Sequence, residues 1–248
     1  MAKTRLDVLL VARGLAPTRE RARALILAGH VSVGGTPSTK AGTAVAEDAE
    51  IVLRQPDHPW VGRGGLKLDH ALTVFGLDVT GATGLDIGSS TGGFTDVMLA
   101  RGAARVVALD VGTAQLDWKL RSDPRVVSIE GVNARYLTAT MLPADAQHFE
   151  IVTIDTSFIS LSHILPVVPP LLAPGGHVVA LVKPQFEAGR HEVGAGGIVR
   201  DPAVHARVIE AVAAAALQVG LVRVGVEPSP ITGAEGNREF LMLLAHHD

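Results

Sequence analysis

The 248-residue sequence contains no cysteine. Disulfide bonds, thiolate metal sites, iron–sulfur clusters and cysteine nucleophiles are therefore excluded, and the composition fits a reducing cytoplasm, where we expect the protein to act. Histidine is the remaining common nitrogen ligand, but none of the ten histidines pairs with another four residues away on a plausible helix. We therefore expect no metal site.

Charge of one sign and uninterrupted apolar segments are also scarce. The chain has 22 Lys and Arg against 25 Asp and Glu, and 47% of its residues are hydrophobic, which disfavours both disorder and a uniformly basic surface. The longest uncharged segment, residues 156–182, contains four prolines and a glycine pair. We expect a short helix, a turn and a buried strand there instead of a membrane span. The N-terminal apolar stretch is short and lacks a cleavage site, so no secretory signal is expected.

The charges are unevenly distributed along the chain. Residues 1–40 carry seven Lys and Arg and two acidic residues, a net charge of +5, which leaves −8 on the other 208 residues. A proline-containing segment without periodicity, residues 55–60, indicates a linker. We therefore expect a small basic domain over 1–60 and a larger, mildly acidic domain over 61–248.

Apolar residues recur at helical spacing in the basic segment and predict two short helices. Gly14 and Gly29 are expected to end these helices, and Thr18 is expected to cap the second. Valine and isoleucine residues between positions 31 and 53 predict short strands.

Arg19, Arg21 and Arg23 lie in the first turns of the second predicted helix, where backbone N–H groups also face outward. They indicate an anion-binding surface, with a solvated basic face as the alternative. The surrounding pattern is R-L-D-x-x-L-x-x-x-G-L-A-x-[ST]-R-x-x-A-x-x-L-I-x-x-G-x-V-x-V-x-G, and it resembles the S-four-type RNA-binding domain, named after a ribosomal protein of the small subunit. The resemblance implies a small α+β module that contacts RNA phosphates through Arg5, Arg19, Arg23 and Lys40.

Beyond residue 80, short β-branched segments alternate with helical stretches. The predicted strands cover residues 83–87, 105–109, 126–129, 151–154, 177–182, 222–226 and 240–244. This alternation predicts an α/β domain with a parallel, doubly wound, Rossmann-like sheet.

The first of these strands leads directly into a glycine-rich turn and then a helix. Glycines allow positive φ angles and close approach of the backbone to a ligand, and the helix start offers free N–H groups. Asp110 ends the second strand, 22 residues after Gly88, where a carboxylate can accept hydrogen bonds from a ribose. Together they predict a nucleoside-containing cofactor: NAD, FAD or S-adenosylmethionine. The candidate cofactor-binding residues of the turn are Asp86, Gly88, Ser89, Ser90, Gly92, Gly93 and Phe94.

Ser90 stands where a diphosphate-binding turn would have its second glycine, so a cofactor without a diphosphate is favoured. The pattern D-x-G-x-x-x-G-G-F-T resembles the first motif of class I methyltransferases, which implies S-adenosylmethionine; a packing turn is the alternative. Asn133, just beyond the third strand, is a candidate for the adenine edge or simply a turn residue.

The acceptor atom can be narrowed by elimination. Without cysteine, methylation at a pyrimidine C5 has no thiolate to add to the ring, and the fourth strand lacks the Asp/Asn-Pro-Pro-aromatic motif of amine methylation. A hydroxyl acceptor is favoured, and its high pKa demands a positioned base or lysine. Asp155 and Lys183 end two predicted parallel strands, where ligands bind in such sheets. Lys67 and Glu239 also adjoin apolar elements, although a surface salt bridge is the ordinary explanation for any one of them.

The S-four-type module and six further motifs together cover essentially the whole chain and resemble the TlyA family of FtsJ-like rRNA 2'-O-methyltransferases. The six motifs are R-G-G-x-K-L, D-I-G-S-S-T-G-G-F-T-D, I-D-x-S-F-I-S-L, V-K-P-Q-F-E, G-x-V-R-D-P and S-P-I-x-G-x-x-G-N-x-E-F. The resemblance implies that Lys183 activates or orients the hydroxyl while the other members of a tetrad hold geometry. This tetrad corresponds to Lys67, Asp155, Lys183 and Glu239.

The same resemblance implies S-adenosylmethionine as cofactor and cytidines of ribosomal RNA, in ribosomal subunits, as targets. The short segments before Arg5 and after the last strand favour action on 23S rRNA, with 16S as a further possibility. Phe158 suits stacking on a base drawn out of a helix, or else belongs to the core.

Two other functions were weighed. A membrane-active protein would fit the uncharged segment and the family's former haemolysin label, but the prolines, the absence of a signal and the acidic body oppose it. A catalytically inactive RNA-binding module is opposed by the intact tetrad.

Overall fold

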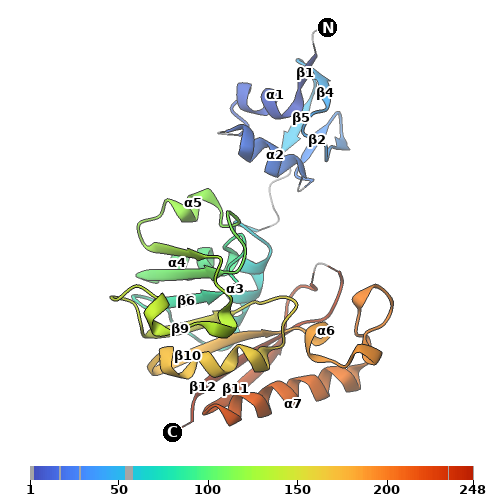
Figure 1. The fold of residues 1–248 in the computed structure, drawn as a ribbon. Helices are drawn as coiled ribbons and strands as arrows, with labels where there is room; N and C mark the ends of the chain where they lie inside the picture. Colours follow the sequence, from blue (N-terminus) through green and yellow to red (C-terminus); the bar gives the residue numbers. More distant parts are fainter. Residues whose placement is uncertain (1–2, 17, 28, 54–57, 234, 248) are drawn as a thin grey trace. The chain divides into compact units, whose positions relative to one another are not determined.

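The computed structural model describes residues 3–16, 18–27, 29–53, 58–233 and 235–247. It divides into two compact units, Met1–Pro59 and Trp60–Asp248, and each is considered by itself (Figure 1). Residues 55–57 of the expected linker lie outside the described residues.

The first unit contains two helices and two small antiparallel sheets. The helices are α1 (Leu6–Ala12) and α2 (Arg19–Leu27); the strands are β1 (Lys3–Arg5), β2 (Val31–Val33), β3 (Thr36–Pro37), β4 (Ala44–Ala46) and β5 (Ile51–Leu53). β1 pairs with β4, and the second sheet has the order β3-β2-β5. The predicted helices and their boundaries are confirmed: Gly14 and Gly29 take φ angles of 68° and 74°, and Thr18 Oγ1 accepts a 3.2 Å hydrogen bond from Arg21 N. Leu6, Leu10, Ala22, Ile26 and Val31 form the centre of its core.

The second unit is built on a seven-stranded sheet of order β11-β12-β10-β9-β6-β7-β8. Its strands are β6 (Thr83–Ile87), β7 (Arg105–Asp110), β8 (Val126–Glu130), β9 (Phe149–Ile154), β10 (Leu172–Val182), β11 (Leu221–Pro228) and β12 (Phe240–His246). All seven predicted strands are present. The predicted doubly wound sheet is confirmed as mostly parallel: β8, β7, β6, β9 and β10 run parallel, whereas β12 runs antiparallel to both β10 and β11. Only residues 229–239 join β11 to β12, and without a crossover helix the chain returns as a hairpin.

Helices cover both faces of this sheet. They are α3 (Gly64–Val74), α4 (Gly93–Ala100), α5 (Trp118–Arg121), α6 (Pro184–Glu187) and α7 (Pro202–Gln218). Neighbouring residues along one strand face opposite cores: Val106 belongs to the core that contains the α3 and α4 side chains, whereas Val107 belongs to the core on the other face, which extends as far as α7. A sheet buried on both faces explains why its central strands are almost uniformly apolar.

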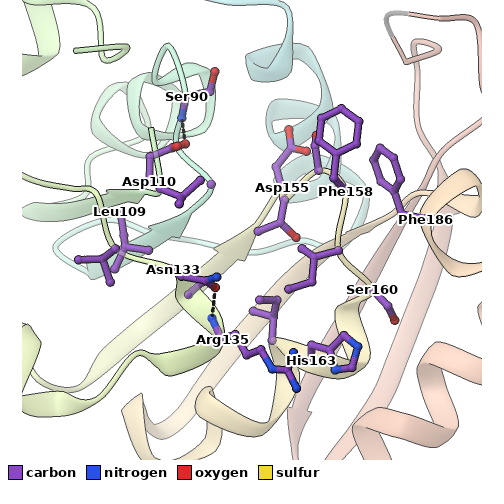
Figure 2. A pocket seen from close by; sticks show the side chains of 18 of the residues that line it. Ser90, Leu109, Asp110, Asn133, Arg135, Asp155, Phe158, Ser160, His163 and Phe186 are labelled. Carbon is purple, nitrogen blue, oxygen red and sulfur yellow. Dashed lines mark hydrogen bonds between the residues drawn. The ribbon is translucent and has the colours of Figure 1, made fainter. Parts of the chain in front are cut away.

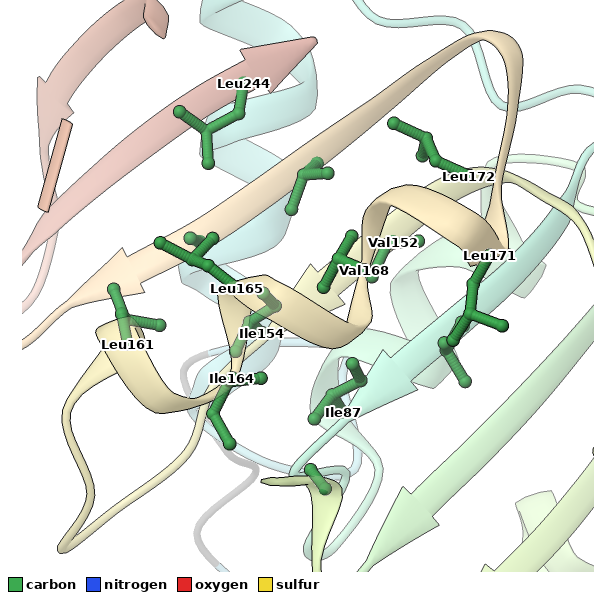
Figure 3. Close-up of a cluster of buried hydrophobic side chains, with 14 of the residues drawn as sticks. Ile87, Val152, Ile154, Leu161, Ile164, Leu165, Val168, Leu171, Leu172 and Leu244 are labelled. Carbon is green, nitrogen blue, oxygen red and sulfur yellow. The ribbon is translucent and has the colours of Figure 1, made fainter. Parts of the chain in front are cut away.

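The uncharged segment expected to hold a helix forms three consecutive 3₁₀ turns, η3 (Leu161–His163), η4 (Leu165–Val167) and η5 (Pro169–Leu171). Prolines in η4 and η5 lack the N–H that a continuous α-helix needs, and the turns place their apolar side chains on the sheet (Figure 3). The segment then enters β10, so the predicted buried strand is confirmed. Among the described residues, no helix is both long and apolar enough to cross a membrane.

Candidate active site

Two adjoining cavities lie at the carboxyl ends of the parallel strands, with volumes of about 850 and 260 Å³. Four residues line both cavities: Gly88, Ser90, Asp155 and Ser157. This edge of the sheet is where ligands bind in open α/β folds. The shared residues mean that a ligand in the larger cavity can meet a second ligand in the smaller one.

Gly88 makes the close approach between the two strand ends possible. Its φ angle is 83°, and a Cβ atom there would lie 2.6 Å from the Asp155 carbonyl oxygen. No other residue fits without moving the backbone that carries Asp155. Ser90, which replaces the expected glycine, takes a left-handed φ angle of 48° with its side chain at the cavity rim.

Asp110 lines the larger cavity at the end of β7 (Figure 2). Its Oδ2 accepts a 2.8 Å hydrogen bond from Ser90 N, and its Oδ1 accepts a 2.7 Å bond from Gly112 N. A carboxylate has about four acceptor positions, so this one is fixed by backbone donors and still able to accept from a ligand. Asn133 lines the same cavity, and its Oδ1 accepts from Arg135 N at 3.0 Å, which caps η1 (Ala134–Tyr136).

Five further predicted residues line a cavity, but not all line the larger one. Ser89, Gly93 and Phe94 face the smaller cavity, while Gly88 and Ser90 face both. Arg135, His163 and Gln115 also line the larger cavity and were not predicted. Their places depend on loops whose course no periodicity in the sequence indicates.

The prediction that Asp86 binds the cofactor needs correction, because Asp86 lines neither cavity. It is fully buried, and its carboxylate accepts hydrogen bonds from Thr95 N, Thr95 Oγ1 and Thr153 Oγ1 at 3.0, 2.6 and 2.9 Å. Burial raises its pKa to about 6. Asp86 therefore ties β6 to the first turn of α4 and to β9, beneath the glycine-rich turn. Gly92 is also outside both cavities, since its Cα faces Leu116 and Leu120.

Lys183 and Asp155 form an ion pair with 2.6 Å between Nζ and Oδ1. Asp155 directly follows β9, and Lys183 directly follows the neighbouring strand β10. Only 9% of the Lys183 surface is exposed to solvent. Lys183 Nζ also donates a 3.1 Å hydrogen bond to Ser157 Oγ, a contact that was not predicted. The motif I-D-x-S could have indicated this contact, because it places the Ser157 hydroxyl two residues after the Asp155 carboxylate at a strand end.

Lys67 and Glu239 form a second ion pair, with 2.6 Å between Nζ and Oε2, and both side chains are buried. Lys67 comes from the first turns of α3, and Glu239 precedes β12. Lys67 lines the smaller cavity with Asp155 and Lys183. Three of the four predicted tetrad residues therefore line one cavity, and Glu239 adjoins it through its ion pair with Lys67. The Lys67–Glu239 pair is buried, whereas Asp155 is partly exposed.

Phe158 takes no part in the core. It is 91% exposed, has a left-handed φ angle of 64°, and its ring centroid lies 5.2 Å from that of Phe186. Both rings stand at the rim of the larger cavity (Figure 2). An exposed aromatic residue in a conformation that bulky side chains rarely adopt indicates a functional constraint.

In the first unit, Asp7 organises two of the predicted RNA contacts. Its fully buried carboxylate binds Arg5 Nε and Arg19 Nη2, each at 3.0 Å, while both arginine side chains remain about half exposed. The hydrogen bond from Arg5 and the charge of Arg19 hold the pKa of Asp7 far below its usual range. Arg23 and Lys40 are exposed. Among the described residues, no group of three or more His, Asp or Glu side chains could hold a metal ion.

Comparison with known proteins gives two domain matches and close relatives. The FtsJ-like methyltransferase family matches residues 60–246, and the S4 domain matches residues 4–51. The chain is 50% identical over 244 residues to the proposed rRNA methyltransferase YqxC of Bacillus subtilis, covering 98% of this chain and 85% of that protein. It is 46% identical over 243 residues to the 16S/23S rRNA (cytidine-2'-O)-methyltransferase TlyA of Mycobacterium tuberculosis, covering 98% and 90%.

A solved structure of a proposed hemolysin from Streptococcus thermophilus matches with a TM-score of 0.77 and 47% identity, covering 100% of this chain and 90% of that one. The extent of these matches leaves no domain of the chain unassigned. The chain belongs to the FtsJ-like methyltransferases and, within them, to the TlyA family, which joins an S4 domain to the methyltransferase domain.

Proposed function

We propose that this protein transfers the methyl group of S-adenosylmethionine to the ribose 2'-hydroxyl of a cytidine in 23S rRNA. The observation that carries the proposal is the Lys183–Asp155 pair, which stands where the larger and smaller cavities meet. A methyl donor in one cavity and a hydroxyl in the other would meet at this pair. The relatives named as rRNA methyltransferases support the substrate class.

The larger cavity fits a nucleoside-containing methyl donor. Gly88 and Ser90 supply a close backbone approach, the fixed Asp110 carboxylate suits the ribose hydroxyls, and Asn133 suits the adenine edge. When bound, S-adenosylmethionine supplies a methyl group activated by its sulfonium. The volume of the larger cavity, about 850 Å³, is in the usual range for cavities that bind small-molecule ligands.

The tetrad residues bind and orient the acceptor hydroxyl. Lys183 would donate a hydrogen bond to one lone pair of the 2'-oxygen and so orient the hydroxyl, leaving the other lone pair to face the methyl group that S-adenosylmethionine would supply. The Asp155 carboxylate would accept the hydroxyl proton as the oxygen takes the methyl group. The buried Lys67–Glu239 pair holds the floor of the smaller cavity, so that Lys183 keeps its position when the cavity is filled.

Phe158 and Phe186 suit the base of the same nucleotide. The Phe158 ring is exposed and the Phe186 ring is half-buried at the cavity rim, and Phe158 can stack on a base that has left its helix, at about 1–3 kcal/mol per base. Arg5, Arg19, Arg23 and Lys40 of the first unit then supply contacts with RNA phosphates, in the cytoplasm where ribosomal subunits assemble.

The test uses the full chain with tritiated S-adenosylmethionine and purified 30S and 50S subunits. Label is expected in 23S rRNA of the 50S subunit, on a cytidine ribose identified by mass spectrometry of nucleosides. Lys183→Ala should abolish transfer while calorimetry still detects S-adenosylmethionine binding. Absence of label in both subunits, or a methyl group on a base, would overturn the proposal.

A further inference from the structure

The basic residues of the second unit fall into two groups. Residues 60–248 contain 14 Lys and Arg against 19 Asp and Glu, so most cations have a carboxylate close by. All three lysines and six of the eleven arginines form ion pairs. No ion pair is present among the described residues for the other five arginines: Arg63, Arg135, Arg190, Arg200 and Arg238.

These five arginines are gathered at the active-site edge of the sheet. Arg63 and Arg135 line the two cavities themselves, and the other three lie in the loops that follow α6 and precede β12. In a unit with excess negative charge, several arginines that lack a paired carboxylate among the described residues and lie at a single edge indicate a surface that can bind an anion.

Two of them, Arg200 and Arg238, each directly follow a residue of one buried hydrogen bond, which joins Val199 N to Asn237 Oδ1. This asparagine is fully buried; its Oδ1 accepts a 2.9 Å hydrogen bond from Val199 N, and its Nδ2 donates a 2.9 Å bond to the Gly197 carbonyl. Arg200 follows Val199 directly, and Arg238 follows Asn237 directly. One buried amide therefore fixes the backbones of both arginines.

The pair is built next to the acceptor site. Arg238 immediately precedes Glu239 of the tetrad, and its loop lines the smaller cavity through Ile231 and Thr232. Both arginine side chains are exposed, and the Arg200 guanidinium lies over Gly194, whose Cβ would be 3.5 Å from Nη1.

In the part of the chain that the structure describes, no carboxylate forms an ion pair with Arg200 or Arg238. Asp201 caps α7 by accepting from Ala203 N at 2.8 Å. Glu235 lies near Gly197, and no ion pair joins it to either arginine. Two rigidly based guanidinium groups with free N–H donors match the geometry of phosphate oxygens.

We infer that Arg200 and Arg238 form a phosphate-binding contact for the RNA strand that carries the target nucleotide. The inference rests on the proposed function and adds a second RNA contact, in the methyltransferase unit, to the one expected in the S4 unit. It places backbone phosphates of the substrate beside the smaller cavity, so that these arginines orient the nucleotide without touching the reacting atoms.

The test compares two double variants that remove the same charge. R200Q/R238Q removes the proposed contact, and R125Q/R223Q removes two arginines that are paired with Asp123 and Glu210. Methylation of 50S subunits is measured between 50 and 200 mM salt, with calorimetry of S-adenosylmethionine binding as a check on folding. R200Q/R238Q should raise the KM for the subunit on the order of ten-fold and reduce the slope of log affinity against log salt by about one per lost contact.

The kcat and the affinity for S-adenosylmethionine should be unchanged in R200Q/R238Q, and R200K/R238K should recover the salt slope. A salt slope equal to that of R125Q/R223Q would overturn the inference, as would an unchanged KM. If the wild-type protein itself methylates no rRNA, the proposed function fails first, and this result is distinguishable because it precedes any variant.

Discussion

Glu187 joins the two strand ends that carry Lys183 and Asp155, because it accepts a 2.6 Å hydrogen bond from Ser160 Oγ and a 2.7 Å bond from Leu161 N. Glu187 ends α6, four residues after Lys183, and the segment that it binds begins after Asp155. A half-buried carboxylate thus fastens the loop of β9 to the loop of β10. Burial raises its pKa above the ordinary value.

Replacing Glu187 should loosen this connection. Glu187→Ala leaves the buried Leu161 N–H without a partner, at about 1–3 kcal/mol of unfolding free energy, and should lower methyl transfer about 10- to 100-fold through misplacement. Ser160→Ala is the matched control, since it removes the bond to Glu187 and the bonds between Ser160 Oγ and Ser162 but keeps the one from Leu161 N to Glu187. Urea unfolding and the methylation assay check both variants; equal losses in the two would contradict the assignment.

The Lys67–Glu239 pair should show a difference between stability and activity. Lys67→Met and Glu239→Leu each leave a buried charge unpaired and should cost about 3–5 kcal/mol of unfolding free energy. The double variant K67M/E239L removes both charges and should regain most of that loss, yet remain inactive. Urea titrations measure the unfolding free energy of each variant, and methylation of 50S subunits measures its activity. An active double variant would show that the Lys67–Glu239 pair has only a structural role.

Asp86 makes stability depend on pH in an unusual direction. Its folded pKa of about 6 lies above the ordinary 3.8, because burial disfavours the charged carboxylate. The folded state therefore binds the proton more tightly, and the contribution of Asp86 to stability grows as the pH falls from about 6 toward 3.8.

Asp86→Asn removes this titration while keeping a side chain that can bond to Thr95 and Thr153. The wild-type protein should gain on the order of 2 kcal/mol relative to Asp86→Asn between pH 7.5 and pH 4. Unfolding of both proteins in urea at the two pH values gives the comparison. A difference that does not change with pH would show that Asp86 titrates normally.

How well the sequence predicts each part of this site depends on how far apart along the chain the residues in contact lie. The central strands β6, β7, β9, β10 and β12 are visible in the sequence because burial on both faces demands apolar residues. Asp155, Lys183 and Glu239 are visible because they adjoin these strands, whereas Lys67 of α3 is identified through the family resemblance. The direction of β12 is not visible in the sequence, since it depends on the absence of a helix after β11. Glu187 and Asn237 are not either, because their partners lie 26 and 38 residues away along the chain.

Asp86 illustrates the opposite difficulty. Its place at the end of a strand before a glycine-rich turn matches a ligand-binding residue, and only its partners Thr95 and Thr153 reveal a buried brace. A sequence motif identifies the turn as a whole, whereas three-dimensional packing decides which of its side chains face the cavity.

Phe158 offers a way to separate strain from function. A non-glycine residue in the left-handed region costs about 1–2 kcal/mol, and this ring, 91% exposed, regains little of it by burial. Phe158→Gly should therefore be more stable than Phe158→Ala by about 0.5–1 kcal/mol, once the greater freedom of unfolded glycine is included. Both variants lose the stacking surface, so both should methylate 50S subunits poorly and to the same degree, while Phe158→Trp keeps the activity. Thermal unfolding and the methylation assay measure the two effects separately. Equal stability of the Gly and Ala variants would show that the Phe158 backbone is not strained. Full activity of either variant would show that the Phe158 ring does not stack on the substrate base.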